Sequence, residues 1–229
     1  MKKISFLILA LLIISCGKEQ ADLTVKTSIK GLKKGTVYLK KATDTSLITV
    51  DSLVINGNSE FELHSNIESP EIFFLYLDKN SSEEDRIMFF ADKGITEINT
   101  TLKNFVIDAK IKGSKQQNVL EDYQLMMSRF NGKNLDLIKE NFEAQRDNDT
   151  IKLDSIEKEY NSLIKRKYLY TVNFALNHKD SEVAPYLALS EIYNARLHLL
   201  DTINNSLTSE VKNSKYGKEL QNFIDKIKE

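Results

Sequence analysis

The sequence predicts an α+β protein in which an N-terminal antiparallel β-sandwich or open barrel is followed by a C-terminal helical region. From about residue 22 to residue 112, apolar residues alternate with polar residues, which is the period of a strand. After Gly113 and Ser114 the apolar period becomes helical and stays helical. A run of strands followed by a run of helices is typical of the α+β class. We therefore expect a β-rich domain at residues 22–112 and a helical domain at residues 113–229.

The β-rich domain should contain about eight short strands, with turn signals between them, as in a sandwich or open barrel. The predicted strands lie at residues 23–29, 37–39, 46–55, 61–63, 72–77, 86–91, 95–100 and 105–111. Asn56 and Gly57 form the strongest short hairpin signal, so the strand that follows them should pair with the strand before them. Residues 72–77 are almost continuously apolar, which predicts a strand that is covered on both faces.

The helical domain should begin at Ser114, because Gln117 stands three residues later in the spacing of a capping box. The predicted helices cover residues 114–130, 135–142, 151–177, a segment capped by Asp180 and Ser181, 202–211 and 215–227. The helix at residues 151–177 should be the longest. Its expected inward-facing residues are Ile156, Tyr160, Leu163, Ile164, Phe174 and Ala175.

The N-terminus has the order of a bacterial lipoprotein signal peptide at residues 1–15. Two lysines precede an apolar run at residues 4–14, and Ser15 stands before Cys16, the only cysteine. A run of about 11 residues is too short to span the hydrocarbon core of a bilayer. We expect cleavage between Ser15 and Cys16, lipidation of Cys16, including a palmitate-type acyl chain, and a lipidated tether at residues 16–21. The alternative is an uncleaved anchor with an incidental cysteine.

Composition argues against several functions. Removing residues 1–15 removes two lysines and no acids, so the formal charge changes from −1 to −3, which predicts no nucleic-acid partner. A lipidated Cys16 leaves no thiol for disulfides, thiolate–metal sites or nucleophilic catalysis.

The three histidines, His64, His178 and His198, are scattered along the sequence, so we expect neither a metal site nor a cofactor. With nucleophile and phosphate-loop motifs also absent, we expect a protein that is not an enzyme. A cleft that gathers a histidine with carboxylates is the alternative.

One group of aromatic residues is a candidate ligand or partner face. It consists of Phe73, Phe74, Tyr76, Phe89 and Phe90. Their pattern favours the core of the sheet, and a groove or docking face is the alternative.

Several short motifs are similar to those of one family. They are residues 35–39 (Gly-Thr-Val-Tyr-Leu), 50–52 (Val-Asp-Ser), 56–57 (Asn-Gly), 69–70 (Ser-Pro), 111–114 (Ile-Lys-Gly-Ser) and 214–218 (Ser-Lys-Tyr-Gly-Lys). They resemble the domain of unknown function 4369, which precedes thioredoxin-like domains in ResA/TlpA-type thiol–disulfide oxidoreductases. In those relatives a thioredoxin-like domain follows the Tyr-Gly-Lys segment. Here the sequence ends at Glu229 and lacks a cysteine pair, so we do not carry the enzymatic activity over.

The resemblance and the signal peptide together imply a cell-envelope lipoprotein that acts as a binding, scaffolding or docking module. We expect it to be attached to the membrane through Cys16, on the outer membrane, facing the periplasm or the cell surface, with an envelope protein as partner. The alternative is an accessory domain that presents substrates to a separate thioredoxin-like oxidoreductase.

Overall fold

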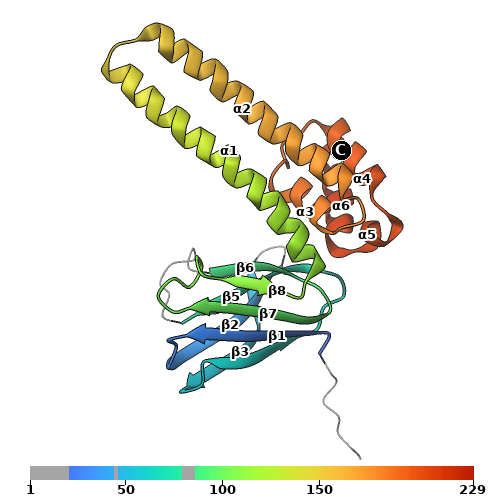
Figure 1. Ribbon diagram of the computed structural model, residues 1–229. Helices are drawn as coiled ribbons and strands as arrows, with labels where there is room; N and C mark the ends of the chain where they lie inside the picture. Colours follow the sequence, from blue (N-terminus) through green and yellow to red (C-terminus); the bar gives the residue numbers. More distant parts are fainter. Residues whose placement is uncertain (1–20, 44–45, 79–85) are drawn as a thin grey trace, which may run out of the picture.

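The structure is a computed structural model that describes residues 21–43, 46–78 and 86–229. Within these residues it contains eight strands followed by six helices. Figure 1 shows two stacked sheets, a long helical hairpin that leans away from them, and a compact group of short helices at the base of the hairpin. The change from strands to helices falls between Lys112 and Lys115, as predicted. The predicted signal peptide and lipidation site lie outside the described residues.

The strands form two four-stranded sheets with the orders β4-β1-β7-β8 and β3-β2-β5-β6. Their bounds are β1 (Leu23–Lys30), β2 (Lys34–Ala42), β3 (Leu47–Asn56), β4 (Glu60–Ser65), β5 (Glu71–Leu77), β6 (Arg86–Ala91), β7 (Gly94–Thr101) and β8 (Lys110–Lys112). The predicted α+β class is therefore confirmed, with an N-terminal unit of two open sheets. β1 and β7 pair in parallel, whereas the other pairings in the described residues are antiparallel.

The predicted hairpin at Asn56 and Gly57 is wrong in its pairing. The turn forms, and Gly57 has the positive φ of 96° that such a turn requires. However, β3 pairs with β2, whereas β4 crosses to the other sheet and pairs with β1. Local turn chemistry determines where the chain reverses, but the burial of Leu63 between the sheets determines where β4 pairs. The turn is therefore a corner between the two sheets.

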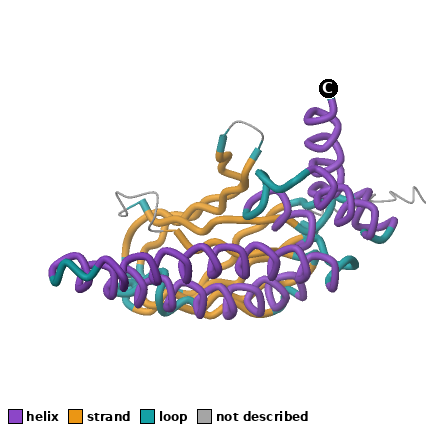
Figure 2. The backbone as a smooth tube through the Cα atoms, turned by 90° about the horizontal axis from the view of Figure 1, so that it is seen from above, coloured by secondary structure: helices purple, strands orange, loops and turns teal. Residues whose placement is uncertain are grey.

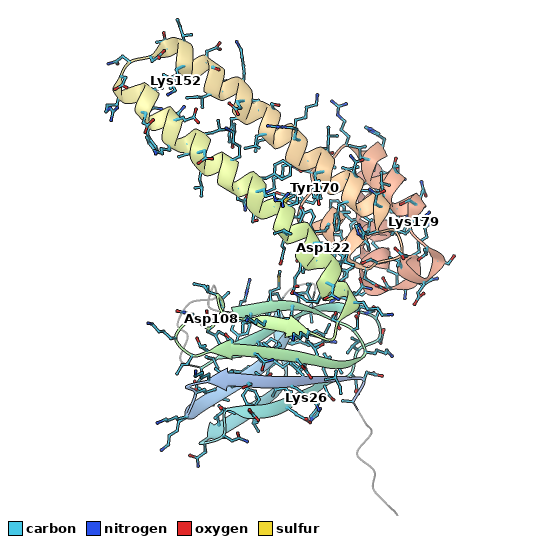
Figure 3. All side chains as sticks on the ribbon, viewed as in Figure 1. Lys26, Asp108, Asp122, Lys152, Tyr170 and Lys179 are labelled. Atoms are coloured by element: carbon cyan, nitrogen blue, oxygen red, sulfur yellow. The ribbon has the colours of Figure 1, made fainter. Side chains whose placement is uncertain are left out.

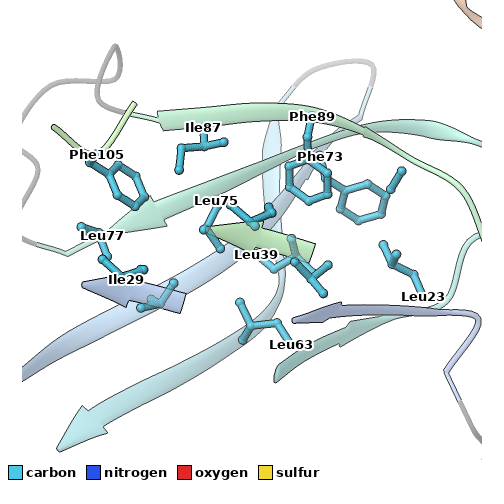
Figure 4. Close-up of a cluster of buried hydrophobic side chains, with 14 of the residues drawn as sticks. Leu23, Ile29, Leu39, Leu63, Phe73, Leu75, Leu77, Ile87, Phe89 and Phe105 are labelled. Carbon is cyan, nitrogen blue, oxygen red and sulfur yellow. The ribbon is translucent and has the colours of Figure 1, made fainter. Parts of the chain in front are cut away.

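The space between the sheets is filled by large apolar side chains (Figure 4). Phe73 and Phe89 are fully buried there, with ring centroids 6.0 Å apart. Phe105 packs into the same core from a turn, so the last predicted strand is shorter than expected and is limited to Lys110–Lys112. β5 is covered on both faces, as predicted, because Leu75 faces this core while Ile72 packs against the helices.

The helices differ from the prediction mainly in where one helix ends and the next begins. Their bounds are α1 (Lys115–Arg146), α2 (Thr150–Asn177), α3 (Val183–Ser190), α4 (Leu197–Ser206), α5 (Ser209–Asn213) and α6 (Lys215–Lys228). α1 continues through the expected gap at residues 131–134, so the separate helix at 135–142 is wrong, and α1, not α2, is the longest helix. The predicted helix at 202–211 is divided between α4 and α5. Packing along a hairpin stabilises a helix across a weak turn signal.

α1 and α2 lie side by side and run past the edge of the strands when seen from above (Figure 2). Asp149 caps α2, with its Oδ1 accepting from the backbone N–H of Lys152 at 2.9 Å. The predicted inward residues Ile156, Leu163, Phe174 and Ala175 are buried. The predicted inward orientation of Tyr160 and Ile164 is wrong. Their side chains are 43% and 47% exposed, because only one face of α2 is covered in this half of the hairpin.

Candidate functional site

The helices meet the sheets around one aromatic residue, Phe90. Its ring is fully buried and lies edge-on to Tyr186 and Tyr216, with centroids 5.7 Å away in both cases. The surrounding cluster contains residues of β5, β6, α1, α2, α3 and α6. The β-rich and helical parts therefore share one continuous apolar junction.

Helix side chains complete the hydrogen bonding of the sheet at this junction. The backbone N–H of Ile72 donates to Tyr216 Oη at 3.0 Å, and that of Phe90 donates to Gln117 Oε1 at 2.8 Å. Burial raises the pKa of Tyr216, so its hydroxyl stays neutral. Ser114 Oγ accepts from the Gln117 N–H at 3.0 Å, which confirms this residue as the helix cap. The Gln117 side chain, however, binds the sheet and not Ser114, so only half of the predicted capping box forms.

A buried ion cluster joins β5 to α6. Glu71 is 4% exposed, and its Oε1 and Oε2 lie 3.1 Å from Lys41 Nζ and 2.6 Å from Lys215 Nζ. Lys215 Nζ also donates to the carbonyl oxygen of Ala42 at 3.0 Å, and its backbone N–H donates to Ser69 Oγ at 3.0 Å. A buried carboxylate needs such partners, because one left unpaired is strongly destabilising. The first residue of α6 is therefore held against the sheet from two directions.

Two adjoining hollows open at the junction and share Glu68, Ser69 and Asn213. The larger, of about 1040 Å³, is lined by the Glu71 cluster and by residues close to the start of β1. The smaller, of about 620 Å³, lies where α1, α3 and α6 begin. Asp92 closes one side of it, with Oδ2 accepting from the first two backbone N–H groups of α1, at 2.5 and 3.3 Å.

The sheets and the start of α1 also have a counterpart among known families. Residues 23–120 match the family described as Domain of unknown function (DUF4369). The DUF4369 match covers both sheets and reaches Leu120, a buried α1 residue of the junction. No curated protein matches the chain.

Within the DUF4369 match, the five aromatic residues predicted as a candidate face lie on both sides of one sheet. Phe73 and Phe89 face the space between the sheets, whereas Phe74, Tyr76 and Phe90 face the helices. All except Tyr76 are buried. They therefore do not line one common groove.

The three histidines are not brought together. His64 lies on β4, with Nδ1 3.4 Å from Thr24 Oγ1, and His178 stacks on Phe174 with ring centroids 4.0 Å apart. His198 is exposed on α4. Among residues 21–43, 46–78 and 86–229, no group of three or more His, Cys, Asp or Glu side chains could hold a metal ion. In the same part of the chain, none of the helices is both long and apolar enough to cross a bilayer.

Sequence reasoning missed the polar residues of the junction, although two signals were present. Glu71 is a single acid at the head of an almost continuously apolar strand, where an unpaired charge would be costly. Lys215 and Tyr216 belong to the segment 214–218, which carries part of the resemblance to the DUF4369 family and begins a predicted helix. The structure shows that this segment and the segment 111–114 border the same hollow, through Gly113 and Ser214.

Proposed function

We propose that this protein is a non-enzymatic lipoprotein of the cell envelope that docks an envelope protein through its helical hairpin. The proposed anchor is a lipidated Cys16 in the outer membrane, on the periplasmic or outer side. The lysine–apolar–serine–cysteine order of the N-terminus supports the anchor. The shape of α1 and α2 supports the docking role.

The outer half of the hairpin is the observation that carries this proposal. It has a small core of its own, made by Leu137, Ala144, Ile156 and Leu163, which is separate from the junction cluster. Figure 3 places Lys152 at the tip, with Asp122 and Tyr170 towards the base. This half of the hairpin therefore has packing of its own, which meets the junction cluster only at Phe130, and it projects a surface away from the sheets.

That surface carries an apolar stripe. Leu135, Ile138 and Phe142 are spaced i, i+3 and i+7, which places them on one face of α1. They are 66%, 42% and 66% exposed, and Ile151 at the start of α2 is 83% exposed. Single exposed apolar residues are ordinary, but a stripe on a projecting element marks an interaction surface. β1 begins on the side of the molecule opposite to the hairpin tip (Figure 1), so an anchor that precedes β1 leaves this stripe accessible.

Crosslinking in intact cells should reveal the partner at this stripe. A photoreactive amino acid placed at Phe142 should give one discrete protein adduct, whereas the same group at Val54, which is 73% exposed on β3, should not. Adding Leu135→Glu should remove the adduct without unfolding the protein, because this side chain is exposed. Equal adducts at Phe142 and Val54 would count against the hairpin as the docking surface.

Lipidation makes a second prediction. Cells fed a clickable palmitate analogue should label the wild-type protein, and Cys16→Ala should lose both the label and the membrane fraction, because no other cysteine exists. A Cys16→Ala protein that still incorporates label would show that the anchor is elsewhere.

A second candidate function is presentation of substrates to a separate thioredoxin-like oxidoreductase. The DUF4369 match supports it, because the resemblance associates this domain with thioredoxin-like domains. The crosslinking experiment separates the two candidates. An adduct whose partner carries a Cys-x-x-Cys pair favours substrate presentation, and any other envelope protein favours simple docking.

A further inference from the structure

A small hollow between α1 and α2, which we call the hairpin hollow, combines an apolar floor with a charged rim. Its volume is about 300 Å³, and its floor consists of Met126, Phe130 and Leu163. Leu163 is 4% exposed, and Phe130 packs on Tyr170 with ring centroids 5.9 Å apart. The floor is therefore held by the same packing that joins the two helices.

The rim of the hairpin hollow carries a net positive charge. Lys133 Nζ lies 3.0 Å from Glu159 Oε1, so these two charges pair across the helices. Arg129 and Arg166 are the other charged residues of the lining, and both are exposed. In the part of the chain that the structure describes, neither arginine forms an ion pair. Three cations and one carboxylate give the lining a formal charge of +2, and the two unpaired guanidinium groups carry it.

Helix geometry directs these two arginines towards each other. The pair between Lys133 and Glu159 sets the register of the antiparallel helices. Arg129 stands four residues from Lys133, and Arg166 stands seven residues from Glu159, both towards the base of the hairpin. At about 1.5 Å per residue, their Cα atoms lie at levels that differ by about 4–5 Å. Helical side chains lean towards the N-terminus of their own helix, so Arg129 leans towards the base and Arg166 towards the tip. The two guanidinium groups therefore converge over the floor.

The surroundings of Tyr170 give the same direction for Arg129. Figure 3 places Tyr170 towards the base of the hairpin. Burial raises the pKa of Tyr170 most, the charge of Asp122 raises it further, and the charge of Arg129 lowers it. The positive charge of Arg129 thus acts on the base side of its own Cα. Asp122, the acid on that side, does not line the hairpin hollow.

The chemistry of this lining selects one kind of occupant. Two guanidinium groups favour a carboxylate, because each presents paired N–H donors that match its two oxygens. The apolar floor shares the same hollow, so the carboxylate must carry an apolar group only a few bonds away. A volume of about 300 Å³ is at the lower limit of ligand pockets, which leaves no room for a long acyl chain.

The last residue of a polypeptide meets these conditions. Its α-carboxylate and its side chain share one carbon atom, and its nitrogen is an uncharged amide. A free amino acid would add an ammonium group, which the two arginines would repel. An internal aspartate or glutamate would place its carboxylate and the nearest apolar side chain on different residues.

We propose that the hairpin hollow binds the C-terminus of a partner polypeptide that ends in an apolar residue, with Arg129 and Arg166 receiving the α-carboxylate and the apolar floor receiving the last side chain. The residues of the apolar stripe do not line this hollow. The inference therefore goes beyond the docking role of the stripe and does not depend on it.

The binding test uses the full chain in a non-ionic detergent and isothermal calorimetry. The probes are the peptide acetyl-Gly-Ser-Phe with a free carboxylate, the same peptide as its C-terminal amide, and 3-phenylpropionate. The acid peptide should bind saturably and about tenfold or more tightly than the amide, because the amide has no charge for the arginines. It should also bind more tightly than 3-phenylpropionate, because the residues before the last one contact the open rim of the hollow.

Arg129→Gln and Arg166→Gln should each weaken binding of the acid peptide about tenfold and leave binding of the amide unchanged. Arg146→Gln is the matched control, because Arg146 is exposed and pairs with Asp147 at 2.9 Å, outside the hairpin hollow. It should leave both affinities unchanged. All three arginines are exposed, so the variants should melt within about 2 °C of the wild type.

Three results would overturn the proposal. The first is equal affinity for the acid peptide and its amide, which would mean that no carboxylate is recognised. The second is unchanged affinity for the acid peptide in Arg129→Gln or Arg166→Gln, which would place the carboxylate elsewhere. The third is 3-phenylpropionate binding as tightly as the acid peptide, which would identify a small organic acid, and not a polypeptide end, as the occupant.

Discussion

Phe90→Ala should lower the free energy of unfolding by about 3–5 kcal/mol, a large share of the stability of an ordinary domain. The ring is fully buried and makes edge contacts with Tyr186 and Tyr216. Such aromatic pairs contribute about 0.5–1.5 kcal/mol each beyond the area that they bury. Because the ring belongs to β6 and its neighbours belong to α3 and α6, the sheets and the helices should lose stability together.

Two probes followed in one chemical denaturation check this result. Far-ultraviolet circular dichroism follows the helices, and tyrosine fluorescence follows the whole chain, since the sequence has no tryptophan. The wild type should unfold in one transition by both probes, and Phe90→Ala should do so at lower denaturant. Phe142→Ala is the matched control, because its ring is 66% exposed and its effect should stay within about 0.5 kcal/mol. Separate transitions for the two probes in the wild type would show that the two parts are stable independently.

The sequence predicted elements well where a local pattern controls them. Period-two alternation located most of the strands, although only Lys110–Lys112 of the predicted strand at 105–111 forms one, and the apolar run of β5 revealed its two covered faces, because both depend on side chains within one segment. The same reasoning failed at the corner after Asn56 and at the continuous α1. In both cases the deciding contacts come from elsewhere, from β1 for the corner and from α2 for the helix. Tertiary packing overrides a turn signal when it buries the flanking residues.

The candidate sites show the same limit more strongly. Glu71 and Lys215 are 144 positions apart, and no spacing rule connects them. Lipidation of Cys16, by contrast, is a prediction that rests on a linear motif alone, and it lies outside the described residues.

Gly217→Ala should destabilise the protein by about 3 kcal/mol or more, although alanine is normally the better helix former by about 1 kcal/mol. A Cβ at Gly217 would lie 2.0 Å from the carbonyl oxygen of Val211 and 2.8 Å from the Cα of Lys212. Both are backbone atoms of α5, so no flexible side chain can move aside. α6 would have to shift, and the shift would weaken the contacts of Lys215 with Glu71 and of Tyr216 with Ile72. The clash therefore outweighs the gain in helix propensity.

Gly132→Ala provides the opposite case in the same protein. Gly132 lies within α1, and a Cβ there would meet nothing within 4 Å. Only helix propensity acts at this position, so alanine should stabilise the protein by about 0.5–1 kcal/mol. Thermal melts of both variants beside the wild type should therefore show a lower Tm for Gly217→Ala and a higher one for Gly132→Ala. If both variants melted above the wild type, α6 would not be held against α5 as closely as the structure shows. The contacts of Lys215 with Glu71 and of Tyr216 with Ile72 would then tolerate a shift of α6.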